Sequence, residues 1–177
     1  MPKTFLWALL ALAIALHVRY YLKVAPELQV YQVSVGNARL HDLLGLKRVL
    51  VLDEAVADVR ELLRTVFRFM FLYQSGDLQA KPHDAWRTCH ARYTILSPQD
   101  GEAHVDVLHP ASRRDVLRVR LQDHRVLVLP PGYRYKLHSL EAQGSKPSLR
   151  RVLLYDWLHL ALRPFATVLR PLAGTRA

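Results

Sequence analysis

Cysteine and glycine are scarce in this sequence, and each shortage excludes a class of protein. The single cysteine, Cys89, cannot form an internal disulfide and has no partner at zinc-ligand spacing. Only 7 of the 177 residues are glycine while 51% are hydrophobic, which excludes a collagen-like or disordered chain. We therefore expect one folded core, a reducing compartment, and Cys89 as a small buried hydrophobe, with a reactive thiol as the alternative.

The sequence also lacks the common catalytic and nucleotide-binding motifs. It contains no G-x-S-x-G nucleophile elbow, no P-loop and no dinucleotide-binding glycine pattern. It has neither zinc-finger spacing nor a glycine-aromatic signature of RNA binding. These absences favour a non-enzymatic protein over an enzyme.

Acidic residues are few in the C-terminal third. Residues 1–110 carry 12 Lys and Arg against 11 Asp and Glu, whereas residues 111–177 carry 13 against 4. This asymmetry predicts attraction to an anionic partner. The candidate partners are lipid head groups, a nucleic acid and an acidic protein face. The alternative is a solvated basic surface without a partner. The residues expected to form the anionic-partner surface are Arg113, Arg114, Arg118 and Arg120.

The longest uncharged hydrophobic run is short and lies near the N-terminus. It covers residues 5–16 (FLWALLALAIAL), and Arg19, Tyr20, Tyr21 and Lys23 follow it. If the basic side chains snorkel and the tyrosines lie at the interface, residues 1–24 form a single-pass transmembrane signal-anchor that binds the protein to a lipid membrane. Positive-inside counting then leaves the domain on the cytoplasmic or virion-interior side. A cleaved secretory signal and a buried helix are the alternatives.

Residues 25–84 are predicted to combine strands with one long helix. Residues 28–35 (LQVYQVSV) alternate as a half-buried strand does, and residues 47–52 (KRVLVL) form a second apolar run. Asp53 can cap a helix over residues 54–74, whose apolar face favours packing on the sheet over lying on a membrane surface. We interpret Gly76 as the C-cap of this helix and the residues up to 84 as a loop.

Six short β-favouring runs follow in residues 85–166. They cover residues 91–96, 103–108, 116–121, 126–129, 133–140 and 149–155, with turn-rich segments between them. This spacing predicts a predominantly antiparallel β-sandwich, and residues 167–177 are left as a tail. The predicted fold class is therefore α+β, with an N-terminal transmembrane helix, an antiparallel β-sandwich and one long packed helix.

The run at residues 126–129 ends in an unusual turn. Pro130 and Pro131 remove two backbone donors and Gly132 tolerates a positive φ, so the chain is expected to turn sharply. Beyond the turn, we expect Tyr133 and Tyr135 to alternate across the sheet, with one ring inward and the other outward.

His104 and Asp106 form an H-x-D pair on a predicted strand, where alternation puts both side chains on one face. The turn at residues 129–135 (LPPGYRY) resembles that of cupin-like and JmjC-like oxygenases. The resemblance implies a cupin-like sandwich with an iron-dependent oxygenase activity, in which His104 and Asp106 would be two Fe(II) ligands. Tyr135 stands where this family has its third ligand, a histidine, so our preferred expectation is no cofactor.

A wider set of segments resembles small membrane-anchored proteins of large DNA viruses. The set comprises the N-terminal run, the W-x-x-C segment at residues 86–89, the His109-Pro110 turn, the turn at residues 129–135 and a Y-D-W-L-H run at residues 155–159. This resemblance implies a virion-associated structural role without chemistry. Together with the charge distribution, it predicts a membrane-anchored, non-enzymatic structural or adaptor protein with a basic surface, and the iron-dependent oxygenase is the alternative.

Overall fold

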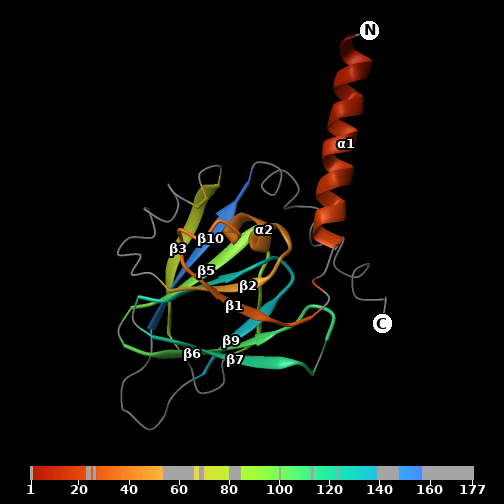
Figure 1. Cartoon of the computed structure of the whole chain (residues 1–177). Coiled ribbons are helices and arrows are strands. Elements are labelled where there is room, and N and C mark those ends of the chain that lie inside the picture. The colour runs from red at the N-terminus through yellow and green to blue at the C-terminus, as the bar shows by residue number, and fades with distance from the viewer. Residues whose placement is uncertain are drawn as a thin grey trace.

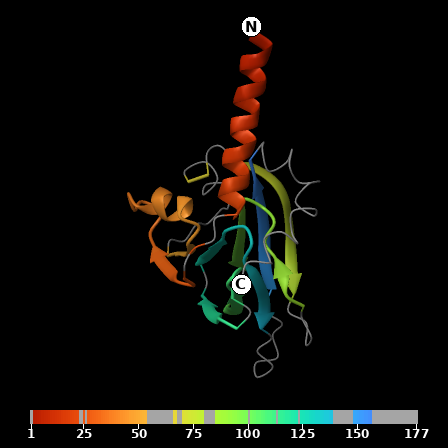
Figure 2. The same ribbon diagram turned by 90° about the vertical axis from the view of Figure 1, so that its right-hand side faces the viewer.

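Two β-sheets form the body of the protein, and a long helix extends away from them. The computed structural model describes residues 2–22, 25, 27–53, 66–67, 70–79, 85–99, 101–112, 114–122, 124–138 and 148–156. Helix α1 (Pro2–Leu22) projects from the sheets in both views, and the short helix α2 (Leu40–Gly45) lies against them (Figures 1 and 2). The sequence patterns did not predict α2.

The sheets differ in size and in how their strands pair. The larger sheet has the order β1 (Val30–Val33), β2 (Val49–Leu52), β8 (Val126–Leu129), β5 (Tyr93–Pro98), β10 (Ser148–Tyr155) and β3 (Phe71–Gln79). The smaller sheet has the order β4 (Arg87–Thr88), β9 (Arg134–His138), β6 (Ala103–Leu108) and β7 (Val116–Leu121). All pairs of strands are antiparallel except β1 and β2. Strands β1 and β7 each form an edge of their sheet.

The main core lies between the two sheets. Val51 of β2 and Leu127 of β8 pack there with Val105 of β6 and Leu137 of β9, so side chains from both sheets fill one interior. Every second residue of β6 and β9 belongs to this cluster, as expected for strands with one buried face. The two sheets therefore form a β-sandwich. The predicted α+β class is wrong, because the described residues lie mostly in β-strands and only α1 and α2 are helical.

A second apolar cluster covers the outer face of the larger sheet. Leu40 and Leu44 lie one helical turn apart on α2, and both are buried against Leu50 and Val128 of the sheet. Phe67 packs in the same cluster, with its ring 5.2 Å from that of Tyr93 between centroids. The central strands β2 and β8 are buried on both faces, which explains their uninterrupted apolar sequences.

Most of the predicted strands are confirmed. The strands expected at residues 103–108, 116–121 and 126–129 have the predicted boundaries. Those expected at residues 28–35, 47–52, 91–96, 133–140 and 149–155 are present with shifted or shorter bounds. The two-residue strand β4 had not been predicted.

The predicted long helix over residues 54–74 is wrong at its C-terminal end. Residues 71–74 belong to β3, which continues through Gly76 and pairs with β10, so Gly76 is not a helix cap and the following residues are not all loop. The register with β10 passes from Gln74 to Leu72, which makes Tyr73 the extra residue of a β-bulge. This bulge breaks the alternation that identifies a strand. Residues 54–65 lie outside the described part of the chain.

The predicted single-pass transmembrane helix, and with it the membrane localisation, is also wrong. No helix among the described residues combines the length and the apolar character that a membrane crossing requires. The continuous apolar part of α1 spans residues 5–16, or about 18 Å of helix, whereas a bilayer core is about 30 Å thick. Helix α1 exposes large apolar side chains, with Phe5 66% and Trp7 69% accessible.

The turn after β8 has the backbone expected from its sequence. Gly132 has a φ of +93°, in the region that side chains with a Cβ rarely enter. The expectation that Tyr133 and Tyr135 would alternate across the sheet is wrong, because both rings are buried in the main core. Residues two apart on extended chain share a face, so alternation itself puts them on the same side.

Gly132 provides a test of this turn. We expect Gly132→Ala to lower the free energy of unfolding by about 1–2 kcal/mol, because an L-residue is strained at positive φ. A Cβ there would also lie 3.5 Å from the Cβ of Pro110. The control is Gly36→Ala, where a Cβ meets no atom within 4 Å and φ is not positive. Urea unfolding of the two variants should show a loss only at position 132, and equal stabilities would contradict the assignment.

Candidate functional site

The outer face of the smaller sheet brings together His104, Asp106, Arg118 and Arg120, which were singled out from the sequence. Its inward residues, such as Val105 and Val119, belong to the core, so alternation turns the residues between them outward. Cross-strand register places His104 opposite Arg120 and His138, and Asp106 opposite Arg118 and Lys136. We call the outward cations of this sheet the basic face; they are Arg118, Arg120, Arg134 and Lys136.

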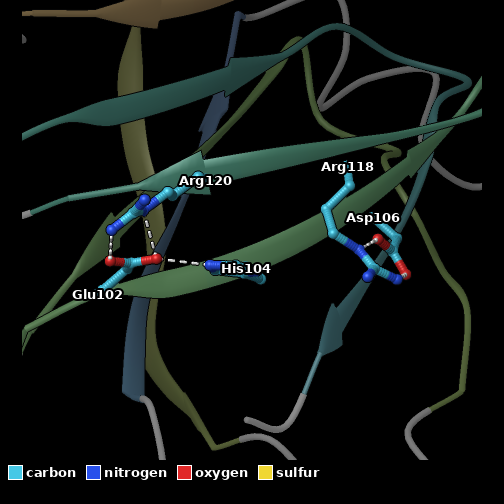
Figure 3. A network of polar contacts seen from close by, with 5 residues as sticks. All are labelled: Glu102, His104, Asp106, Arg118 and Arg120. Atoms are coloured by element: carbon cyan, nitrogen blue, oxygen red, sulfur yellow. Dashed lines mark hydrogen bonds and ion pairs between the residues drawn. The ribbon is translucent and has the colours of Figure 1, made fainter.

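Two ion-pair groups order the basic face (Figure 3). Arg118 donates from Nε to Oδ1 of Asp106 at 2.7 Å and from Nη2 to Oδ2 at 3.3 Å, a two-point contact with a largely buried carboxylate. Arg120 donates from Nε to Oε1 of Glu102 at 2.5 Å, and the same oxygen accepts from Nε2 of His104 at 2.5 Å. The arginine side chains remain more than half accessible, at 54% for Arg118 and 62% for Arg120.

These contacts change the acidity of the groups involved. The hydrogen bond from Arg120, followed by that from His104, lowers the pKa of the Glu102 carboxyl. The hydrogen bond to Asp106, with the attraction of its charge, raises the pKa of Arg118. Both effects favour the charged forms, so the face carries fixed charges at neutral pH.

An iron site of the cupin type does not fit these residues. His104 and Asp106 share a face as predicted, but that face is the outside of the sandwich, and both side chains are engaged in ion pairs. Tyr135, which stands at the position of the third ligand, lies opposite Val107 on the inward face. Among the described residues, no three His, Cys, Asp or Glu side chains are grouped as metal ligands. His104 and Asp106 therefore act here as members of the ion-pair groups.

Three sequence features far apart in the chain meet at one end of the sandwich. Gly132 donates its backbone N–H to the carbonyl of Cys89 at 2.9 Å, and Cys89 donates its own backbone N–H to the carbonyl of Tyr133 at 2.8 Å. His109 packs edge-on against the Tyr133 ring, with centroids 5.6 Å apart, and its Nε2 donates to the carbonyl of Ala25 at 2.8 Å. The W-x-x-C segment, the His-Pro turn and the Pro-Pro-Gly turn thus form one packed junction, in which Pro130 and Pro131 are also buried.

Burial favours the neutral forms of the ionisable side chains in this junction. Burial raises the pKa of the Cys89 thiol to about 12 and that of the Tyr133 hydroxyl to about 12. Burial also raises the pKa of Tyr135. At neutral pH the thiol is protonated, and the junction has the properties of a structural contact rather than a nucleophilic site.

A groove separates the edge strands β1 and β7. Its volume is about 670 Å³, and it is lined by Leu28, Gln29, Val30, Tyr31, Gln32, Val51, Leu117, Arg118, Val119, Arg120 and Arg125. Arg125 donates from Nε to Oδ1 of Asp53 at 3.0 Å, and Gln32 donates to the same carboxylate. Three arginines therefore line a groove whose lining also includes several apolar residues.

The structure brings together only part of the predicted anionic-partner surface. Arg118 and Arg120 are neighbours on the basic face, whereas Arg114 lies in the exposed turn between β6 and β7, where its backbone N–H donates to Oγ of Ser112. Arg113 lies outside the described residues. Sequence analysis missed Arg125, Arg134 and Lys136; the alternation of residues 134–138 could have identified the last two, but nothing local marks Arg125.

Comparison with known proteins does not extend this description. No family model and no curated protein matches the sequence. Part of the chain is similar to hydroxypropylphosphonic acid epoxidase from S. wedmorenis, with 16% identity, a TM-score of 0.36, and coverage of 45% of this chain and 40% of the epoxidase. It is also similar to QdtA 3,4-ketoisomerase from Thermoanaerobacterium thermosaccharolyticum, with 13% identity, a TM-score of 0.33, and coverage of 49% and 60%.

A third partial match is Drosophila melanogaster CENP-C bound to CAL1, with 17% identity, a TM-score of 0.36, and coverage of 46% of this chain and 78% of that one. The chain spans less than two thirds of the epoxidase and of the ketoisomerase. The fold of this chain is therefore assigned from its own strand pairings, which define a two-sheet β-sandwich.

The ion-pair group at Glu102 predicts how the stability of the protein depends on pH. Arg120→Gln removes the hydrogen bond that contributes most to the lowered pKa of Glu102, so this pKa should rise toward its usual value of 4.5. A carboxyl with a lowered folded pKa adds stability at neutral pH that is lost as the pH falls through that pKa, so the variant should lose less stability in acid. Carboxyl ¹³C NMR titration measures the shift. Arg125→Gln is the control because Arg125 pairs with Asp53, and identical Glu102 titrations in all three proteins would contradict the assignment.

The raised pKa of Cys89 predicts an unreactive thiol. Ser34 is exposed, so a Ser34→Cys variant of the full chain should present one thiol that reacts at once with Ellman's reagent at pH 8. Cys89 should react in that variant and in the native protein only after addition of denaturant, because the buried thiol is protonated and shielded. Rapid reaction of the native protein would show that Cys89 is accessible.

Proposed function

We propose that this protein is a non-enzymatic binding protein, of the structural or adaptor type, that holds an anionic macromolecular partner on its basic face. The observation that carries the proposal is the placement of Arg118, Arg120, Arg134 and Lys136 on one side of one small sheet. The cations extend from paired strands, so their spacing is fixed before any partner arrives. Preorganised charge of this kind both speeds association and reduces the entropy lost on binding.

The ion pairs within the face support this proposal. Arg118 and Arg120 are each held by a carboxylate through Nε and Nη2, which orients the guanidinium while leaving Nη1 without an acceptor among the described residues. Both side chains remain accessible to a partner. A guanidinium fixed by one carboxylate presents its remaining donors in a defined direction, and oxygen acceptors such as carboxylates or phosphates fit that geometry.

The charge of the surroundings also favours an anionic partner. The chain has a formal net charge of +10, so its long-range field attracts anions in general. The basic face adds a local contribution that should be distinguishable from this general attraction. Salt will weaken both, because exposed charges are screened beyond about 8 Å at physiological ionic strength.

A charge-matched pair of variants tests the proposal. The first double variant, Arg120→Gln and Lys136→Gln, removes two cations from the basic face. The second, Arg39→Gln and Arg150→Gln, removes two exposed arginines elsewhere. Fluorescence anisotropy with labelled poly-glutamate and with a single-stranded oligonucleotide, at several salt concentrations, measures binding. We expect the first variant to bind about tenfold more weakly and with a shallower salt dependence, while the second stays near the native affinity.

Circular dichroism and urea unfolding would establish that both variants remain folded. Equal losses in the two variants would mean that binding depends on net charge alone, and the basic face would then have no special role. Absence of binding to either probe by the native chain at low salt would contradict the proposed function altogether.

A further inference from the structure

The groove between β1 and β7 has features that the basic face alone does not explain. It runs between the open edges of the two sheets, so it lies where the wall of the sandwich is incomplete. We propose that this groove binds an extended acidic peptide, which adds as a strand to the edge of β1 and fills the gap in the wall. This inference rests on the proposed function, since it names the class of anionic partner.

The open edge of β1 has backbone hydrogen-bonding groups that meet no partner among the residues that the structure describes. Asp53 donates its N–H to the carbonyl of Val33, which shows that Val33 points its backbone groups toward β2. Backbone groups alternate in direction along a strand, so those of Gln32 and Val30 point to the opposite, open edge. Gln32 is exposed, and this edge has no strand partner among the described residues. An added peptide strand would pair with these groups.

The side chains of the groove predict the sequence pattern of the peptide. The apolar residues of the lining face the interior of the sandwich; they are Leu28, Val30, Val51, Leu117 and Val119. The charged residues of the lining are three arginines; each pairs with one carboxylate outside the lining, and Nη1 of Arg118 and of Arg120 has no acceptor among the described residues. A strand that fills the gap has one face toward this interior and the other toward the outside, where Arg118 and Arg120 project. Alternating apolar and acidic residues match these two faces.

The dimensions of the groove set a minimum length for the peptide. Residues 28–32, which include the start of β1 and the two residues before it, line the groove, and five extended residues span about 17 Å. Five to seven peptide residues would therefore occupy the whole edge. A nucleic acid could neutralise the same arginines, but it has no backbone amides to pair with a strand edge, and the lining offers only Tyr31 as an aromatic side chain for base stacking.

The first experiment uses a labelled heptapeptide of alternating Glu and Val and the full-length protein. We expect it to bind, whereas a Lys-Val peptide should not, and a Glu-Ser peptide should bind at least tenfold more weakly for lack of apolar contacts. Two further Glu-Val peptides carry N-methyl groups on alternate residues in the two possible registers. At least one of these should bind about tenfold more weakly, because N-methylation removes the donors that face β1.

The second experiment changes the edge of the protein. Gln32→Pro removes the N–H that points into the groove, and Gln32→Ala is its matched control, since both variants lose the side-chain contact with Asp53. Proline is tolerated on an edge strand where its nitrogen faces away from the sheet. We expect the proline variant to bind the Glu-Val peptide about tenfold more weakly than the alanine variant, while both bind the oligonucleotide with equal affinity.

The outcomes separate this inference from the proposed function. If the oligonucleotide binds through the basic face and the Glu-Val peptide does not bind, the peptide groove is wrong and the proposed function stands. If neither probe binds, both are wrong. If the peptide binds but both N-methylated registers bind equally well, strand addition is overturned even should Gln32→Pro fail to fold.

Discussion

The alternation of side chains along β6 is the constraint on which the candidate site depends. The core contains Ala103, Val105 and Val107 of β6. Because side chains alternate along a strand, His104 and Asp106 face outward. There they meet the arginines of β7, which are turned outward by the same rule. One shift in register would bury the charged residues and expose the apolar ones. The hydrophobic core thus fixes the geometry of the basic face, although none of the face's side chains belongs to that core.

The same rule explains which parts of the fold were predictable from the sequence. Strands β6, β7 and β8 have either clear alternation or a continuous apolar run, and their boundaries could be predicted. Strand β3 could not be, because the bulge at Tyr73 breaks its alternation and Tyr73 continues the helical spacing of Val66 and Met70 before the strand. Its pairing with β10 over the whole length determines its structure, and this long-range contact is not visible in the local sequence.

The candidate site was predictable only in part for a similar reason. The sequence places His104 with Asp106 and Arg118 with Arg120 on polar faces opposite apolar ones, but it does not state which strands are neighbours in the sheet. The ion pairs of the candidate site depend on that long-range strand pairing. The junction at Gly132 shows the same limitation: the positive φ follows from the local sequence, whereas the contacts with Cys89 and His109 depend on segments more than 20 residues away.

Open edges add a constraint that acts between molecules. An exposed strand edge invites pairing with any extended chain, and proteins commonly protect such edges with charged side chains. Arg118 and Arg120 lie on the edge strand β7, so a second copy of this basic chain, with its formal charge of +10, meets repulsion there. An acidic strand meets attraction at the same place. Under the proposed function, the arginines therefore oppose self-association and favour partners of opposite charge, because one electrostatic field has both effects.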